Sequence, residues 1–360
     1  MAEPVAIVGG GPAGMALALA LHRQGVTAQI FDARGRGAAT DDARVLALSH
    51  GARQILEGLG VWDAIPVTPI TTIHVSQQGG LGITRLHAGD EGVPALGYVL
   101  AAGDLAASLD AAIAKNAIAF HDHHHVDHRH LPAAPLTVWA EGSVADEAAV
   151  TRDYRQHAVI CTARMQAPHA GCAWERFTPA GPVAVLPFGR EIAVVLTCAA
   201  DDATTVAAEP DDAFLGRLQS RFGSRLRFTA VGTRQVFPLG LRYRRQPVGE
   251  RQVWIGNAAQ TLHPVGGQGF NLALRDIHDL ARCLADAADP GAPEILARYA
   301  RARQLDRHAA IGFTDLLVRL FSNDNPLLRH ARGAGLLALD LLAPARSFIA
   351  RRMMFGARAW

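Results

Sequence analysis

Apolar and polar positions at the start of the chain fall into blocks that predict a strand, a helix and a second strand. The run at 5–8 is wholly apolar, as expected of a buried parallel strand. A helical pattern follows at 13–24 and ends at Gly25, a residue suited to a helix C-terminus. A second apolar run, 28–31, leads into Asp32. This order predicts a βαβ unit with a parallel sheet.

The middle of the chain changes to short β-like runs separated by glycine and proline turns, and its end is mostly helical. Strands are expected at 158–161, 182–187, 192–196 and 253–255, and helices at 49–60, 104–115, 211–222 and from Asn271 onward. The fold class is therefore expected to be α/β, with a Rossmann-like parallel sheet, an inserted antiparallel β-sheet and a helical C-terminus. The expected domains are 1–69, 97–160 and 250–325 for the nucleotide-binding part, 70–96 and 161–249 for the β-rich substrate part, and 326–360 for a basic helical tail.

Composition and charge narrow the class of protein. The 360 residues are 49% hydrophobic and 19% charged, as in a well-packed globular protein of two domains or one two-part domain. A formal net charge of +2 gives no overall basic field of the kind that holds nucleic acid. Four cysteines without a CxxC pair favour a reducing setting, and the acidic start argues against a signal peptide. We therefore expect a cytoplasmic protein that binds no nucleic acid.

Gly9, Gly11 and Gly14 stand directly between the first strand and the first helix, in the spacing of a dinucleotide-binding turn. Gly9 would make the turn, Gly11 would let the backbone approach a pyrophosphate, and Gly14 would let helix and strand pack closely. Asp32 would accept hydrogen bonds from an adenosine ribose. The alternative is a glycine turn in an unrelated βα unit, and the motif does not choose between NAD and FAD. A similar spacing at 333–338 follows a helical segment instead of a strand and is discounted.

A second glycine-rich loop, at 256–269, lies between an expected strand and an expected helix. Its glycines would let the backbone lie against a flat ring. The N-terminus of the following helix would face a site that becomes anionic, and a reduced flavin fits that demand. This loop therefore favours FAD over NAD. His263 lies within it and would either face the flavin or bond the backbone.

Five segments carry a resemblance to a known family, namely Gly9 to Gly14, Asp42 to Ser49, Leu59 to Trp62, Glu175 to Pro179 and Gly256 to Asp276. With them the chain resembles the ubiquinone-biosynthesis FAD-dependent aromatic-ring hydroxylases, flavoprotein monooxygenases similar in fold to para-hydroxybenzoate hydroxylase. The resemblance covers essentially the whole chain, and its last two segments are specific to the quinone branch.

The resemblance implies non-covalent FAD, with NADH or NADPH as co-substrate. Cofactor contacts are implied for Gly9, Gly11, Pro12, Ala13, Gly14, Asp32, Arg44, Glu141, Gly142, Gly256, Asn257, Pro264, Gly267, Gln268, Gly269 and Asn271. Flavin-facing candidates are His263, Pro264, Gly266, Gly267 and Gln268, and no metal is implied. Arg44 would lie near the diphosphate, and its alternative is an ion pair with Asp41 or Asp42. Asn257 stands where many members have Asp, and an amide can still accept a hydrogen bond there.

Three departures from the family pattern bear on the nicotinamide contacts. The central Asp-Gly of the family is Glu141-Gly142 here, which displaces the carboxylate by one methylene. An arginine that is common before the helix at 104 is replaced by Gly103, and the segment 115–136 is shorter than in most members.

The reaction implied by the resemblance is hydroxylation of a phenolic or polyprenyl-phenol ring by O2 in ubiquinone biosynthesis. The alternative is a flavin-binding relative that no longer hydroxylates and serves as a scaffold among quinone-synthesis partners. A flavin halogenase is disfavoured because no WxWxIP-like segment is present, and no G-x-S-x-G motif supports hydrolysis.

Two further segments have competing interpretations. The histidine-rich run 121–130 invites a metal site, but without nearby cysteines or a second ligand cluster a solvated loop is favoured. The tail from Arg329 to Trp360 mixes arginines with apolar residues. It would lie on an anionic bilayer, placing the protein peripherally on the inner membrane, or pack on the protein or a partner subunit. Asp340 and Pro344 argue against a spanning helix.

Overall fold

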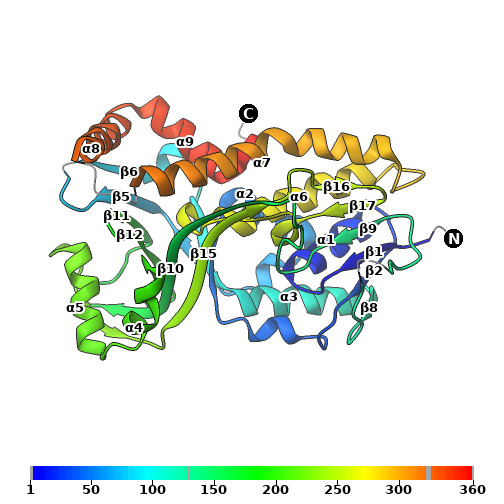
Figure 1. Cartoon of the computed structure of the whole chain (residues 1–360), viewed down its shortest axis with the longest axis horizontal. Helices are drawn as coiled ribbons and strands as arrows, with labels where there is room; N and C mark the ends of the chain where they lie inside the picture. Colours follow the sequence, from blue (N-terminus) through cyan, green and yellow to red (C-terminus); the bar gives the residue numbers. More distant parts are fainter. Residues whose placement is uncertain (1–2, 81, 128–129, 322–325, 359–360) are drawn as a thin grey trace.

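The computed structural model describes residues 3–80, 82–127, 130–321 and 326–358. Figure 1 shows two β-sheets side by side, with the helices of the C-terminal region running along one edge of both. One sheet belongs to the nucleotide-binding part expected from the sequence and the other to the inserted β-rich part. The α/β fold class expected from the sequence is thereby confirmed.

The first sheet has six strands in the order β16-β17-β9-β1-β2-β8. Every neighbouring pair is parallel except β16 with β17. The expected strands at 5–8, 28–31 and 253–255 are present. The strands β8 and β9, of three residues each, were not expected, because so short a run shows no periodicity. The strands are β1 (Val5–Val8), β2 (Ala28–Phe31), β8 (Ala119–His121), β9 (Thr137–Trp139), β16 (Val248–Gly249) and β17 (Gln252–Trp254).

Four helices pack on this sheet through the largest apolar cluster of the protein: α1 (Pro12–Arg23), α2 (His50–Leu59), α3 (Ala102–Lys115) and α6 (Gln268–Leu284). Helix α2 begins after Ser49, whose side chain accepts a hydrogen bond from the N–H of Ala52, and it ends at Gly60 with a left-handed backbone. Helix α3 begins at Ala102, earlier than the expected 104, so Gly103 lies inside the helix instead of before it.

The second sheet has nine strands and is antiparallel except where β5 runs parallel to β11. Its order is β18-β15-β10-β13-β12-β11-β5-β6, with β14 paired to β10. The strands are β5 (Thr72–Gln77), β6 (Ile83–His87), β10 (Val150–Met165), β11 (Cys172–Thr178), β12 (Gly181–Phe188), β13 (Glu191–Ala199), β14 (Phe228–Val231), β15 (Gln235–Tyr243) and β18 (Gln260–Thr261). Strand β10 runs across the expected domain boundary at 160, because its first half alternates exposed and half-buried residues that give little apolar signal.

The two faces of the nine-stranded sheet have different partners. One face packs on α4 (Ala203–Ala207) and α5 (Asp211–Phe222) through an apolar cluster that includes Val183, Val194 and Phe214. Because side chains alternate along a strand, the residues between these point to the opposite face. A small sheet of β3 (Val45–Ser49), β7 (Gly97–Ala101) and β4 (Thr68–Ile70) lies between the two larger parts and contacts both α2 and β12.

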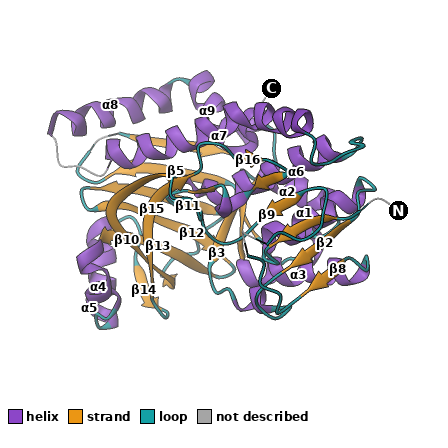
Figure 2. Ribbon diagram, turned by 45° about the vertical axis from the view of Figure 1, so that its right-hand side comes forward, coloured by secondary structure: helices purple, strands orange, loops and turns teal. Residues whose placement is uncertain are grey.

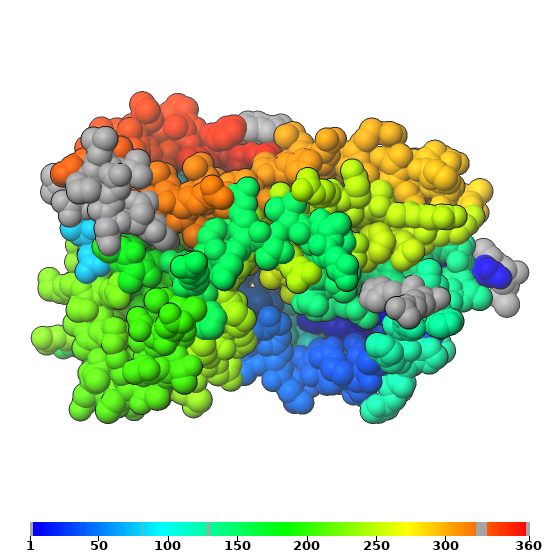
Figure 3. All heavy atoms as spheres, in the orientation of Figure 1, coloured from blue at the N-terminus to red at the C-terminus, as the bar shows by residue number. Residues whose placement is uncertain are grey.

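Three helices end the chain: α7 (Pro293–Phe321), α8 (Pro326–Leu341) and α9 (Ala343–Phe355). Helix α8 packs on β5 and β6, and α9 packs on α2, β3 and β6. Figures 2 and 3 show these helices along one edge of the molecule, beside the nine-stranded sheet. Within the described ranges, no single helix is long and apolar enough to cross a bilayer. The segments 330–341 and 343–355 are long and apolar enough only when they are taken together, and a bend of 97° separates them.

A buried group of charges joins α6 to α7. The guanidinium of Arg303 contacts Asp276 and Asp306, each at 2.7 Å, and Arg275 contacts Asp306 at 2.7 Å. All four side chains are almost wholly shielded from solvent. Asp306 also accepts a hydrogen bond from the N–H of Ala357 at 2.9 Å, which fixes the end of the chain beyond α9.

Candidate flavin site

The first glycine turn has two glycines that the protein itself requires and one that faces empty space. A Cβ on Gly14 would lie 1.9 Å from the carbonyl oxygen of Gly9, and Gly9 has φ +113° with its own Cβ position 2.8 Å from the backbone of Ala140. A Cβ on Gly11 would meet nothing within 4 Å. No side chain caps the N-terminus of α1, so its positive end faces the space beside Gly11. This arrangement provides a cradle for a phosphate group.

Asp32, which follows β2, connects this turn to the end of the strand by hydrogen bonds. Its carboxylate accepts hydrogen bonds from the N–H of Gly10 at 2.6 Å and from the N–H of Arg34 at 2.8 Å. Burial opposes ionisation, but the hydrogen bonds from Arg34 and Gly10 outweigh it and lower the pKa of Asp32. The side chain is therefore a carboxylate at neutral pH, as a ribose acceptor has to be, and the ribose contact itself stays a prediction.

Arg44 forms an ion pair with Asp42, which was one of its two expected interactions. Its guanidinium bonds both carboxylate oxygens of Asp42, with Nη2 to Oδ2 at 2.6 Å. The pair is half-exposed at the start of β3. A contact of Arg44 with a diphosphate remains a prediction.

The second glycine loop meets the first, although more than 240 residues separate them in the sequence. Gly256 has φ +55°, and a Cβ there would lie 3.5 Å from Ala13 at the start of α1. Gly266 and Gly267 both have positive φ, at +74° and +62°, as expected of a backbone that turns sharply before α6. Pro264 and Asn257 are exposed, and Gly269 has open space at its Cβ position. The structure thus brings the two predicted halves of the cofactor site together.

Asn271 has a structural task that the sequence did not reveal. Its amide oxygen accepts from the N–H of Ser49 at 2.8 Å, and its amide nitrogen donates to the carbonyls of Ala47 and Gly267 at 3.0 and 2.6 Å. These bonds hold the glycine loop against β3. Asn271 therefore positions the loop from within the protein.

His263 bonds the backbone, which was one of its two expected roles. Its Nδ1 accepts a hydrogen bond from the N–H of Val265 at 3.2 Å, and the ring is only 1% exposed. Burial lowers the pKa of His263 to about 4, so the ring is neutral at physiological pH. Its Nε2 is buried and has no hydrogen-bond partner in the described structure.

The residues that depart from the family pattern are built into this site. A Cβ on Gly9 would lie 3.0 Å from the backbone nitrogen of Glu141, so Glu141 and Gly142 follow β9 directly beside the first glycine turn. A Cβ on Gly103 would lie 2.3 Å from the carbonyl oxygen of Thr40, and its N–H donates to Asp42. An arginine at position 103 would therefore clash, because the η1 helix (Ala38–Asp41) has closed onto α3.

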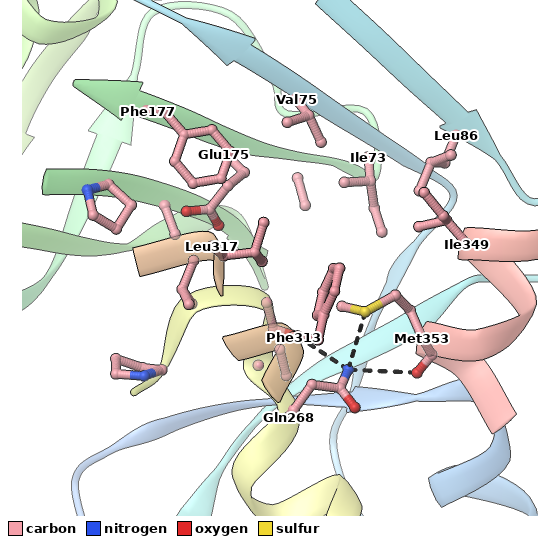
Figure 4. Close-up of a pocket in the computed structure, with 18 of the residues that line it drawn as sticks. Ile73, Val75, Leu86, Glu175, Phe177, Gln268, Phe313, Leu317, Ile349 and Met353 are labelled. Carbon is pink, nitrogen blue, oxygen red and sulfur yellow. Dashed lines mark hydrogen bonds between the residues drawn. The ribbon is translucent and has the colours of Figure 1, made fainter. Parts of the chain in front are cut away.

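A cavity of about 500 Å³ opens beside the second glycine loop. Its walls are the free face of the nine-stranded sheet, the loop 263–268 and the inner sides of α7, α8 and α9. Figure 4 shows side chains of the sheet, α7 and α9 around it. Nearly all lining side chains are apolar, including Ile73, Val75, Leu86, Phe177, Ala184, Phe313, Leu317, Leu336, Ile349 and Met353. Gln268 donates to the carbonyl of Gly266 at 3.2 Å and to that of Met353 at 3.5 Å, which ties the loop to α9.

The packing of α8 and α9 on the protein was one of the two interpretations of the tail, but their contribution to a cavity was not predicted from the sequence, and neither was the acidic side chain that β11 places in this cavity. Helices α8 and α9 were interpreted as a basic tail, although the spacing of Leu336, Ile349 and Met353 was a signal for burial. Glu175 was noted only as part of a motif, and it lines this cavity.

The histidine-rich run is not gathered into a recognisable ligand set. In the part of the chain that the structure describes, no group of three or more His, Cys, Asp or Glu side chains is placed to hold a metal ion. His121 contacts Gln29, and His130 contacts Asp127. His128 and Arg129 of this run lie outside the described residues.

Comparison with known proteins assigns the chain to a protein family. The model of the FAD binding domain family matches residues 2–104 and 132–314. The ubiquinone hydroxylase UbiL of Rhodospirillum rubrum is 34% identical over 382 residues, which span 97% of this chain and 89% of UbiL. The chain belongs to the FAD-dependent hydroxylases of ubiquinone biosynthesis.

Other relatives of this hydroxylase agree with that placement. The 3-demethoxyubiquinol 3-hydroxylase of Escherichia coli is 28% identical over 372 residues, 93% of this chain and 94% of the relative. In fold, the hydroxylase resembles PqsL of Pseudomonas aeruginosa, with a TM-score of 0.74 at 20% identity over 94% of this chain and all of PqsL. An HpxO variant of Klebsiella pneumoniae in complex with FAD gives 0.75 at 13% identity over 97% and 98% of the two chains.

The geometry fits the cofactor of the family. FAD is the cofactor of this hydroxylase, and NADH or NADPH is its co-substrate. The open space at Gly11 and the uncapped helix α1 suit the diphosphate, and the left-handed Gly266 and Gly267 expose backbone beside the cavity. Which of the predicted residues touch FAD stays a prediction.

Proposed function

We propose that this hydroxylase acts on a phenolic ring that carries a polyprenyl tail. The observation that supports this most directly is the cavity, whose walls are apolar and which adjoins the loop expected to face the flavin. Apolar surface of this kind stabilises a hydrocarbon chain by roughly 25 cal/mol per Å² removed from water. Bound FAD supplies the transfer of electrons from NAD(P)H to O2 and of one oxygen atom to the ring.

The residues of the chain orient the ring and exclude water. Met353 closes the space above Gly266, where a Cβ would lie 3.0 Å from its methyl group. Gln268 and Asn271 use their side chains to fix the loop. The apolar walls limit the access of bulk water to the reacting groups.

The decisive experiment measures oxidation of NADH and NADPH by purified, FAD-loaded protein with and without a prenylated phenol. We expect oxidation to accelerate on addition of the phenol and a hydroxylated product to form. A protein that holds FAD but shows neither effect with any prenylated phenol would instead be a scaffold in quinone synthesis.

We expect the substitution Glu141→Asp to accelerate reduction of the bound flavin. The extra methylene of Glu141 moves its carboxylate by roughly 1.5 Å, enough to lengthen a hydrogen bond past its useful range. Stopped-flow reduction by NAD(P)H measures the effect, and FAD affinity should change little. A slower Glu141→Asp variant would show that the backbone beside Gly9 is adapted to glutamate, and would favour an efficient hydroxylase.

We further propose that the bend between α8 and α9 rests on the lipid bilayer of the inner membrane. Leu341 and Leu342 at this bend are 74% and 57% exposed, while the opposite sides of the same helices line the cavity. A substrate tail could then pass from lipid into the protein without crossing water. Arg346 and Arg351 contact Asp90 and Glu91 of the protein, so apolar insertion contributes more to binding than the basic charge of the tail.

A double substitution tests this surface. We expect Leu341→Gln with Leu342→Gln to reduce sedimentation with anionic vesicles several-fold, with only a weak effect of salt on the parent protein. The matched control is Leu305→Gln with Leu316→Gln, which changes exposed leucines of α7. Equal binding of the bend variant and the parent would contradict the proposal, and so would an equal loss in the control.

A further inference from the structure

Glu175 stands in the middle of β11 and points into the cavity. It shares the cavity face of the strand with Ala173 and Phe177, as the two-residue period requires. Its register neighbours are Val75 on β5 and Ala184 on β12, and both line the same wall. Figure 4 shows the carboxylate directed into the cavity, toward Leu317 of α7.

The Glu175 carboxyl has no partner within the described residues, since neither a hydrogen bond nor an ion pair involves it. The side chain is only partly exposed, and it lines the cavity together with Ala173 and Phe177 of the same strand. A carboxyl without a partner in an apolar cavity is costly, so such a group is expected where a ligand completes it.

The other polar side chains of the cavity are already engaged or neutral. Gln268 and Asn271 bond the backbone, and Ser49 caps α2. His263 is neutral, and Arg332 of α8 donates to the carbonyl of Leu320 at 2.6 Å. Among the described residues, His263 and Arg332 are the ionisable groups that line the cavity along with Glu175. Burial raises the pKa of Glu175 to about 7.

We propose that Glu175 is a catalytic residue that accepts the hydrogen bond of the substrate's phenolic hydroxyl and then its proton. This inference rests on the proposed function of the cavity. The proton passes from the ring oxygen to the carboxylate, so the phenol becomes a phenolate and Glu175 becomes a neutral acid. The ring gains electron density for attack on oxygen, and no other reagent is consumed in this step.

The pKa values of a phenol and of Glu175 suit such a role. A phenol has a pKa of about 10, so full transfer to a group of pKa about 7 is unfavourable in the resting complex. Glu175 therefore holds the hydroxyl by a charge-assisted hydrogen bond and takes the proton as the ring reacts. An ordinary glutamate with a pKa near 4.3 would be a much weaker base.

The first test is binding of 4-heptylphenol and of 4-heptylanisole to the FAD-loaded protein by calorimetry. We expect the parent to prefer the phenol about tenfold or more, because the ether cannot donate a hydrogen bond. Glu175→Leu should lose this preference, and Glu175→Gln should weaken it. The control Glu191→Gln, at the start of β13 in a partly exposed pair with Arg164, should retain it. An unchanged preference in Glu175→Leu with an intact flavin spectrum would overturn the proposal.

The second test is the pH profile of kcat/KM with a prenylated phenol. We expect the parent value to rise about tenfold from pH 6 to pH 8, as a base of pKa about 7 loses its proton. Glu175→Gln should be slow and flat over this range, and Glu175→Asp should restore part of the slope. A Glu175→Gln variant that keeps the parent profile would overturn the assignment.

The two proposals fail in different ways. If the parent prefers the phenol over the ether but never hydroxylates it, the proposed function fails while the contact of Glu175 with the hydroxyl stands. If the parent hydroxylates phenols and Glu175→Leu binds and converts them equally well, the assignment of Glu175 fails and the proposed function stands.

Discussion

Replacing Gly11 with leucine abolishes FAD binding while the apoprotein stays folded. The backbone at Gly11 has φ −77° and ψ −178°, which any residue adopts, and a Cβ there meets no protein atom within 4 Å. The new side chain would occupy only the space in which the diphosphate is expected. We expect at least a hundredfold loss of FAD affinity, measured by flavin absorbance after reconstitution and gel filtration.

Gly14→Ala provides the contrasting variant. Its Cβ would lie 1.9 Å from the carbonyl oxygen of Gly9, so this substitution should lower the thermal stability of the apoprotein as well as FAD binding. A yellow Gly11→Leu protein with parent-like affinity would refute the placement of the diphosphate. So would a Gly11→Leu apoprotein as unstable as Gly14→Ala, since its loss of FAD would then reflect misfolding.

Substitution of Asp306 by alanine is expected to be the most destabilising single change in the charged group between α6 and α7. Asp306 faces the guanidinium groups of Arg275 and Arg303, each at 2.7 Å, and all three are buried. Removing one partner leaves uncompensated buried charge, which typically costs about 3–5 kcal/mol. Chemical denaturation of the apoprotein measures the loss. The control Glu57→Ala removes an exposed pair with Arg53 and should cost less than about 1 kcal/mol.

The same group predicts the response of stability to acid. Burial opposes ionisation of Asp306, but the neighbouring arginines outweigh it and lower its pKa to about 2. A carboxyl with a depressed folded-state pKa stabilises the fold fully above its unfolded value of about 3.9, and this contribution declines as pH falls toward 2. Asp306→Asn should flatten that decline between pH 4 and pH 2. A denaturation series with equal slopes in parent and variant would contradict this role.

Local features of the fold could be predicted from the sequence because short segments determine them. The strand Ala28–Phe31 and the helix Asp211–Phe222 have the expected bounds, since apolar runs and period-3.6 patterns are read within a few residues. The first glycine turn could also be predicted, because Gly14 is required by its contact with Gly9 inside one βα unit, although Gly9 itself packs against Ala140.

Features that depend on distant contacts could not be predicted in this way. The arginines of the tail looked like a basic surface, but Arg332 is buried against the cavity and Arg351 reaches Glu91. Asn271 was predicted as a cofactor contact, which stays a prediction, but its hydrogen bond with Ser49, more than 200 residues earlier, could not be foreseen. The isolation of Glu175 depends on three strands and three helices at once. No local pattern contains that information.

The part of the cavity wall formed by α8 and α9 is synthesised after both glycine loops. Both glycine loops precede α8 and α9 in the chain, so they leave the ribosome earlier. A nascent chain therefore completes the two predicted halves of its cofactor site before the cavity is enclosed. A product that terminated after α7 would keep both loops, while the cavity face of the sheet would be open to water. A chain without α8 and α9 would thus lack the cavity walls that these two helices supply.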